Sequence, residues 1–256
     1  MVKIATWNVN SVKARLVHLV DWLKSADPDI VLLQEIKCTT EDFPRLEIEA
    51  AGYCCAAVGQ KSYNGVAIVA KEKITDLVNA LPGGDEDDHA RYLEATVGDL
   101  RVASIYLPNG NPIDTPKFRY KLDFLERLYR HTQELLATER PTVLGGDFNV
   151  CPTDEDVWDV KAMARDALVQ PETRAAFRKV LYLGWTDAIR ALHPHGRRYT
   201  YWDYFQNRFA RDHGLRIDHL LLSPRAADRL TECGIDRGPR AREKASDHTP
   251  VWCTLQ

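Results

Sequence analysis

The spacing of apolar residues along the chain predicts a mixture of strands and helices. Residues 2–9 alternate between apolar and polar side chains, which is typical of a strand with one buried face. Residues 30–33 form a continuous apolar run, as in a strand that is covered on both faces. Similar patterns predict further strands at residues 66–69, 100–107, 142–144, 216–222 and 249–255.

Two segments have the period of a helix instead. Ser11 can cap a helix whose apolar stripe runs from Val12 to Leu23 and which ends before Pro28. Pro116 suits the first turn of a longer helix that reaches about Glu139. Helices and strands do not follow a strict βαβ rhythm, so we predict an α/β fold with packed sheets and outer helices. No linker rich in Gly, Pro or Ser interrupts the pattern, and we expect one domain over residues 1–256.

The composition is that of an ordinary globular protein, with 45% hydrophobic and 28% charged residues. No apolar run approaches the roughly 20 residues that span a bilayer. The first residues enter a strand pattern directly, without a basic region followed by an apolar core. The six cysteines have neither C-x-x-C nor zinc-ligand spacing. We therefore expect a soluble, cytoplasmic protein with free thiols and no membrane partner.

The net charge of -3 does not by itself suggest a polyanion as partner. The charge is unevenly distributed, because residues 174–244 carry 15 Lys and Arg against 8 Asp and Glu. A basic segment on an acidic body is compatible with one face that binds nucleic acid. It is equally compatible with a solvated surface that has no ligand.

Polar residues follow several of the predicted strands directly. Asn8 ends the first strand and Glu35 follows the second. A carboxylate at the end of a buried strand is costly unless it is paired, so it lies at a rim or binds a cation. Oxygen ligands of this kind suit Mg²⁺, with Mn²⁺ as a substitute. Asn8 alone is more typical of a turn.

Three later segments repeat the arrangement. Asp147 and Asn149 follow two glycines, and in an extended segment their side chains point the same way. Asp218 lies between apolar residues and therefore needs a partner. His248 titrates near neutral pH and can act as a general acid, a general base or a phosphate contact. Each segment also has a purely structural interpretation as a turn or as surface.

Together these segments resemble the exonuclease III family of apurinic/apyrimidinic endonucleases, within the endonuclease/exonuclease/phosphatase superfamily. The resemblance covers essentially the whole chain. It rests on TWNVN at residues 6–10, LQEIK at 33–37, YLPNG at 106–110, GDFNV at 146–150, GLRID at 214–218 and SDH at 246–248. For the fold, it implies a four-layer α/β/β/α sandwich with two packed, mostly antiparallel sheets. For the function, it implies a metal-dependent DNA-repair phosphodiesterase that cuts 5′ to abasic sites in duplex DNA and degrades 3′ ends. By default, we expect a monomer.

The resemblance also implies roles for individual residues. Glu35 resembles the principal metal ligand, and Asp147 resembles the residue that positions or deprotonates the attacking water. Asn149 and His248 resemble the groups that hold the scissile phosphate, and Asp218 resembles the carboxylate that orients the histidine. The remaining expected members of the site are Asn8 and Asp247 near the metal, and Tyr106 and Asn109 beside the phosphate; Asp147, Asn149 and His248 are also expected as metal ligands.

The aromatic and basic segment around residues 199–217 is expected to contact the substrate. Aromatic side chains interleaved with arginines suit a nucleic-acid groove, although a strand with core aromatics has the same composition. By resemblance, this region forms a pocket for an extruded abasic sugar, which base loss makes easier to extrude. The expected substrate contacts are Tyr63, Asn109, Trp202, Phe205, Leu215, Arg216 and Ile217.

Two other functions remain open on these residues. A non-catalytic nucleic-acid binder of the same fold is expected to lack one of the site residues, and all are present. A phosphatase that acts on a small phosphate ester has no need of the aromatic and basic segment. The segment between Asp147 and Asp218 is shorter than is usual in the family, which leaves the balance between incision and 3′ degradation open.

Overall fold

Two six-stranded sheets stacked face to face form the centre of the molecule. The computed structural model describes residues 1–84 and 86–256. The first sheet has the order β11 (Leu230–Ile235), β12 (Val251–Leu255), β1 (Val2–Asn8), β2 (Ile30–Gln34), β4 (Val66–Ala70) and β3 (Cys54–Val58). The second has the order β5 (Ile74–Val78), β6 (Tyr92–Val97), β7 (Leu100–Tyr106), β8 (Thr142–Asp147), β10 (Asp218–Leu222) and β9 (Thr186–Asp187).

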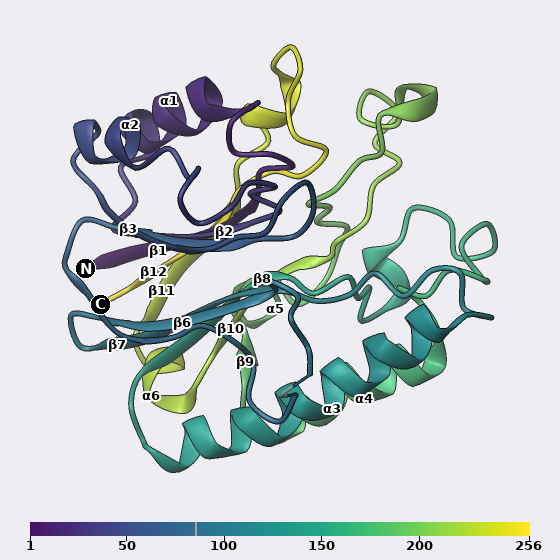
Figure 1. The fold of residues 1–256 in the computed structure, drawn as a ribbon. Helices are drawn as coiled ribbons and strands as arrows, with labels where there is room; N and C mark the ends of the chain where they lie inside the picture. Colours follow the sequence, from purple (N-terminus) through teal and green to yellow (C-terminus); the bar gives the residue numbers. More distant parts are fainter. Residues whose placement is uncertain (85) are drawn as a thin grey trace.

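Helices cover the outer faces of both sheets, which completes four layers (Figure 1). On the outside of the first sheet are α1 (Leu16–Ala26) and α2 (Arg45–Ala50). On the outside of the second are α3 (Pro116–Ala137) and α4 (Pro171–Tyr182). The short elements are α5 (Ala188–Leu192), α6 (Pro224–Ala227) and the 3₁₀ turns η1 (Asp154–Asp156), η2 (Phe205–Asn207) and η3 (Pro239–Ala241). The expected four-layer sandwich is confirmed.

Alternation along the strands distributes apolar side chains between the layers. Ile4, Leu32, Val102 and Leu220 are fully buried between the two sheets. Their sequence neighbours face outwards, so that Trp7 and Leu33 pack with the residues of α1. Successive side chains of a strand point to opposite faces of the sheet. Both faces of a central strand such as β2 are covered, so β2 is apolar at almost every position.

Each sheet is antiparallel except for one central pair. β1 and β2 run parallel in the first sheet, and β7 and β8 run parallel in the second. Parallel neighbours end at the same edge of a sheet, so residues that follow them come together. Asn8 pairs with Gln34, directly before Glu35, and Tyr106 pairs with Asp147.

One expectation about the helices is wrong. The first helix begins at Leu16, not after a cap at Ser11. The N–H groups of Ser11 and Val12 donate to the carbonyls of Glu35 and Ile36 at 2.7 and 3.1 Å. These bonds tie the segment after β1 to the loop after β2, which delays the start of the helix. Pro116, by contrast, does begin α3.

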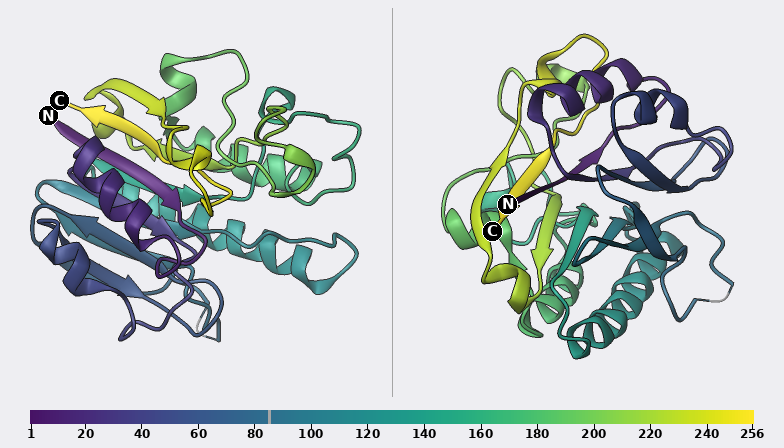
Figure 2. Two further views of the ribbon diagram at one scale, coloured as in Figure 1. Left: turned by 90° about the horizontal axis from the view of Figure 1, so that it is seen from above. Right: turned by 90° about the vertical axis from the view of Figure 1, so that its left-hand side faces the viewer.

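Both chain ends lie where β1 begins and β12 ends. This end of the first sheet is opposite the end at which β1 and β2 finish. Val2 pairs with Leu255 across β1 and β12, and the two views of Figure 2 place the termini side by side. None of the helices in the described residues combines the length and the apolar character that a bilayer crossing requires.

Candidate active site

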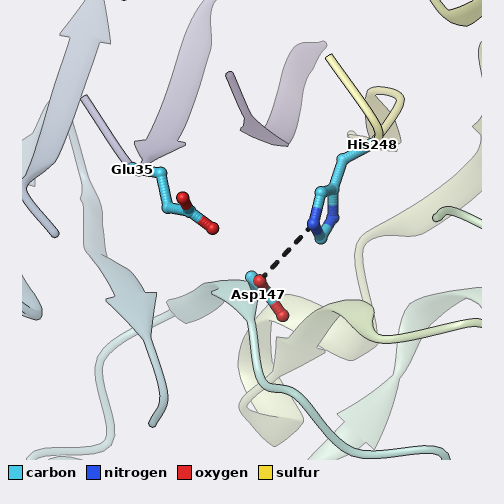
Figure 3. A group of neighbouring side chains, drawn as sticks. All are labelled: Glu35, Asp147 and His248. Atoms are coloured by element: carbon cyan, nitrogen blue, oxygen red, sulfur yellow. Dashed lines mark ion pairs between the residues drawn. The ribbon is translucent and has the colours of Figure 1, made fainter. Parts of the chain in front are cut away.

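The carboxyl ends of the two parallel strand pairs meet between the sheets. Asn8 is the last residue of β1, and Glu35 follows β2 at a positive φ of 50°. Asp147 is the last residue of β8 and lies opposite Asp218 of β10. His248 arrives from the loop before β12. Figure 3 shows that Glu35, Asp147 and His248 point toward one another from three segments that are far apart in the sequence.

Two glycines near the end of β8 allow close packing, Gly145 against the opposite sheet and Gly146 against the neighbouring strand. A Cβ atom on Gly145 would lie 2.5 Å from Cδ1 of Leu32 in the opposite sheet. A Cβ atom on Gly146 would overlap the carbonyl of Ile105 in the neighbouring strand. Any larger side chain would therefore separate β8 from its neighbours and move Asp147.

The amide of Asn8 bridges the two sheets. Its Nδ2 donates to Oε1 of Glu35 at 2.8 Å and to Oδ2 of Asp147 at 3.0 Å. The other oxygen of Glu35 pairs with Nζ of Lys37 at 2.7 Å. Burial alone would raise the pKa of Glu35, but Lys37 and Asn8 outweigh it and lower the pKa. Glu35 is therefore ionised at neutral pH.

Asp218, His248 and Asp147 form a chain of charged groups. Nδ1 of His248 lies 2.8 Å from Oδ2 of Asp218, and its Nε2 lies 3.7 Å from Oδ2 of Asp147. Burial opposes protonation of His248, but the carboxylates of Asp218 and Asp147 raise its pKa to about 10. The hydroxyl of Thr200 donates to Oδ2 of Asp218 at 2.6 Å and fixes that carboxylate. The imidazole is therefore an imidazolium that can donate from Nε2.

Asp147 is fully enclosed by the site. Burial raises its pKa, Asp218 and Glu35 add to the rise, and His248 opposes it. The backbone N–H of Asn149 donates to Oδ1 of Asp147 at 2.9 Å, which fixes the orientation of the carboxyl group. A raised pKa makes this carboxylate a better proton acceptor than an exposed one.

The donor set fits a hard divalent cation. Glu35, Asp147 and His248 each offer one atom within 4.8 Å of the other two. Carboxylate oxygens are the ligands that such cations prefer, whereas an imidazolium has no free lone pair for a metal. Oδ1 of Asn8 accepts from the N–H of Asn10 at 3.0 Å, so its amide N–H faces the carboxylates. Glu35 and Asp147 thus offer carboxylate oxygens to a cation, and the expected contribution of Asn8, Asn149 and His248 as ligands stays a prediction.

The side chains of Asn149 and Asn109 lie together next to Asp147. Nδ2 of Asn109 donates to Oδ1 of Asn149 at 3.0 Å, and Nδ2 of Asn149 donates to the carbonyl of Leu107 at 3.0 Å.

Asp247 is held at the rim, where it accepts from Nδ2 of Asn10 at 3.0 Å. Burial, with the nearby carboxylates of Glu35 and Asp147, raises the pKa of Tyr106 far above the ordinary range, so it stays a neutral phenol.

These groups line a cavity of about 340 Å³. Of the expected substrate contacts, Asn109, Leu215 and Ile217 belong to the lining. The full lining comprises Glu35, Tyr106, Asn109, Asp147, Asn149, Met163, Asp166, Leu168, Tyr201, Asp203, Arg208, Leu215, Ile217, Asp247 and His248. The apolar lining residues belong to one packed cluster and form an apolar wall of the cavity, which also carries the carboxylates: Met163, Leu168, Tyr201, Leu215 and Ile217.

Trp202 and Arg216 are expected as substrate contacts, but neither side chain lines the cavity. The side chain of Trp202 is fully buried and donates to Oδ1 of Asp212 at 3.1 Å. Arg216 is 1% exposed and forms ion pairs with Asp156 at 2.6 Å and Asp187 at 2.7 Å. A buried arginine needs such partners, so this residue supports the fold beneath the site instead of contacting a ligand.

Phe205 and Tyr63 lie outside the cavity lining. Phe205, in η2, is 75% exposed, and Tyr63, between β3 and β4, is 70% exposed. Both are available to a large ligand that extends beyond the cavity, and their contact with a substrate stays a prediction.

The sequence analysis missed several members of the site. Met163, Asp166, Leu168 and Asp203 line the cavity from loops without a recognisable pattern. The helical period could have identified Lys121 as a buried residue. It lies on the apolar stripe of its helix, three and seven residues before Phe124 and Leu128. Burial lowers the pKa of Lys121, Asp147 and Asp166 oppose the shift, and three carbonyl acceptors match the three N–H donors of its charged form.

The chain matches a known protein family along most of its length. The model of the endonuclease/exonuclease/phosphatase family matches residues 5–248. The chain belongs to this family. Exodeoxyribonuclease III of Haemophilus influenzae is 32% identical over 269 residues, which cover 99% of this chain and 100% of that protein.

Two solved structures of family members have nearly the same fold. The 3′-5′ exonuclease NExo of Neisseria meningitidis superimposes with a TM-score of 0.97 at 39% identity, over 99% of each chain. An AP endonuclease of Archaeoglobus fulgidus has a TM-score of 0.97 at 36% identity, over 100% of each chain. Neisseria NExo has also been solved as a 3′ phosphatase bound to a product DNA hairpin. Family members with this fold thus include an exonuclease, a 3′ phosphatase and an endonuclease.

Proposed function

We propose that this chain is a metal-dependent DNA-repair phosphodiesterase that hydrolyses sugar–phosphate links at abasic sites and at 3′ ends of duplex DNA. The observation that carries the proposal is the convergence of Glu35, Asp147 and His248 within 4.8 Å at a cavity that has an apolar wall. Full-length similarity to exodeoxyribonuclease III of Haemophilus influenzae supports DNA as the substrate.

Asp147 is the residue we assign to the attacking water. Its carboxylate is buried, is oriented by the N–H of Asn149, and has a raised pKa. In this role it accepts the proton of the water as the oxygen attacks phosphorus. The bond from phosphorus to the leaving sugar oxygen then breaks, and that oxygen takes a proton from solvent water and leaves as a hydroxyl group.

The negative charge that develops on the phosphate needs donors that are already in place. The imidazolium of His248 supplies one, because Asp218 holds it protonated and oriented. The amides of Asn109 and Asn149 and the phenol of Tyr106 supply neutral donors beside it. Preoriented donors in an enclosed site stabilise such charge more than water does.

Glu35 and Asp147 are the residues we assign to the metal. When bound, a divalent cation such as Mg²⁺, or Mn²⁺ in its place, would neutralise charge on the phosphate. Lys37 pairs with the second oxygen of Glu35 at 2.7 Å and holds that carboxylate at the site. Asp247, whose carboxylate is at the rim, is assigned to a second acidic contact.

The apolar wall is suited to a deoxyribose without its base. Leu215, Ile217 and Leu168 offer hydrocarbon contacts, and Arg208 offers a charge at the same cavity. A small-ester phosphatase gains little from this wall. We infer that the enzyme acts as a cytoplasmic monomer on extruded abasic sugars and 3′-terminal nucleotides.

The test is a set of cleavage assays on duplexes that carry one internal abasic site, a recessed 3′ hydroxyl or a 3′ phosphate, with an intact duplex and a soluble phosphate ester as controls. We expect cleavage with Mg²⁺ on the damaged or recessed substrates and none with EDTA. Activity that survives EDTA contradicts the metal role. Phosphate release from the soluble ester without any action on DNA favours the phosphatase, and DNA binding without turnover favours the non-catalytic binder.

A further inference from the structure

Lys121 is a buried cation next to the site, and the mechanism above does not use it. It lies in the second turn of α3, and none of its side chain is exposed. Among the described residues, no carboxylate forms an ion pair with it. A fully buried ammonium group without such a partner is unusual, because the loss of hydration must be compensated by other acceptors.

The acceptors of Lys121 are three backbone carbonyls. Its Nζ donates to the carbonyls of Pro108 at 3.1 Å, Asn109 at 3.1 Å and Asn149 at 2.6 Å. An ammonium group has three N–H donors, so all of them are used. The carbonyls belong to the loops that follow β7 and β8.

These two loops carry the amides that are assigned to the phosphate. Asn109 and Asn149 bond each other through their side chains at 3.0 Å, and Lys121 holds the backbone of both residues. The loop after Asn109 also packs on the lysine stem, since a Cβ atom on Gly110 would lie 2.6 Å from Cδ of Lys121. A shift of Lys121 would therefore move both amides together.

We propose that Lys121 is a positioning residue, which sets the separation and direction of the Asn109 and Asn149 side chains through their backbone carbonyls. The inference rests on the proposed function, because it assumes that these two amides hold the scissile phosphate. Lys121 does not touch the substrate. Its effect is expected on the chemical step, for which donor geometry must be correct to within a fraction of an ångström.

The principal variant is Lys121→Met, which keeps the hydrocarbon stem and removes all three donors. We expect kcat on the 3′-phosphate duplex to fall about 10-fold to 100-fold, while KM and DNA affinity measured in Ca²⁺ change less than about threefold. Lys121→Arg keeps the charge and several donors and should recover much of the loss. Thr132→Ala, at another buried polar position of α3, serves as the matched control for destabilisation of the helix and should keep the kcat of the unmodified protein.

A double-mutant cycle with Asn149→Ala separates positioning from a general loss of structure. If Lys121 acts through Asn149, Lys121→Met should lower kcat much less in the Asn149→Ala background than alone. Fully additive losses, or a Lys121→Met enzyme with kcat within twofold of the unmodified protein, would overturn the inference. If Lys121→Met does not fold, Lys121→Gln enters the same cycle. Failure of the unmodified protein to cleave DNA contradicts the proposed function itself, whereas cleavage that is insensitive to Lys121 contradicts only this inference.

Discussion

Asn8 shows how much one side chain contributes to this site. It is fully buried and has no charge, yet its amide nitrogen lies between two carboxylates that come from different sheets. Two carboxylates that face each other without a donor or a cation repel and favour protonation. Asn8 therefore holds Glu35 and Asp147 in place and limits their repulsion.

The Asp147→Asn change tests the assigned base. We expect kcat to fall by about 10²-fold to 10⁴-fold, because the proton acceptor is lost while the shape is kept. Stability should not fall: burial raises the pKa of Asp147 above its value in the unfolded chain, so the ionised group disfavours folding at pH 8. Thermal unfolding in EDTA at pH 8 should give a Tm at or above that of the unmodified protein. A rate within tenfold of the original would contradict the assignment.

The Asp218→Asn change tests how His248 is kept protonated. Asp218 is the largest favourable influence on the His248 pKa, which it raises toward 10. Its removal lowers that pKa, so the imidazolium is lost at a lower pH. The alkaline limb of the pH profile of kcat/KM should therefore move to lower pH. Asp187→Asn removes a buried carboxylate that bonds Arg216 and should leave this limb in place; an unmoved limb in Asp218→Asn would exclude His248 as the titrating group.

At the scale of elements, the site depends on the two parallel strand pairs. β1 with β2 and β7 with β8 are the parallel neighbours in otherwise antiparallel sheets. Each pair delivers two side chains to the site, and Gly145 of β8 allows the two sheets to lie close together there. The first turns of helix α3 support the loops of the site through Lys121. The middle of the helix contacts β6 instead.

The middle of α3 is anchored by an ion pair that titrates. Nε2 of His131 lies 2.6 Å from Oε2 of Glu94 in β6, and Glu94 also pairs with Arg101. Burial lowers the pKa of His131, but Glu94 outweighs it and raises the pKa above 6.5. This contribution to stability is complete below about pH 6.5 and is lost as pH rises through the folded-state pKa.

His131→Gln should therefore destabilise the protein most at acidic pH. We expect the difference in the free energy of unfolding between the unmodified protein and His131→Gln to be larger at pH 6 than at pH 9, as measured by urea denaturation. Catalytic rates should not change, since His131 does not belong to the cavity lining. A difference that is independent of pH would show that His131 is not charged in the folded state.

At the scale of the molecule, the chain ends and the site lie at opposite ends of the central strands of the first sheet. Val2 pairs with Leu255, whereas Asn8 marks the site end of the same strand. The connection from β4 to β5, around exposed Glu72 and Lys73, also lies at the edge away from the site.

A circular permutant should exploit this geometry. Joining residues 256 and 1 through a short Gly/Ser linker and opening the chain between Glu72 and Lys73 alters only the edge that is remote from the site. We expect a folded protein with kcat within about threefold of the original. A permutant that is opened between Leu144 and Gly145, inside β8, should not fold. Loss of cleavage in the first permutant despite a normal Tm would show that the two edges are coupled.

The sequence by itself determined the central strands and most of the polar residues at their ends. Apolar runs such as residues 30–33 leave little choice about burial, and a polar residue at the end of such a run has to find a partner. The motif order also predicted the family and the four-layer fold. These are local properties, or properties of the whole chain, that need no knowledge of contacts.

Only the tertiary structure decided which side chains face the cavity. Arg216 and Ile217 are adjacent, yet one is enclosed by Asp156 and Asp187 and the other lines the cavity. Likewise, Trp202 is fully buried, whereas its neighbour Tyr201 lines the cavity. Lys121, which lies on the buried face of its helix, reaches three carbonyls that are at least 12 residues away. Spacing cannot predict such outcomes, because they depend on which groups other segments bring within hydrogen-bonding distance.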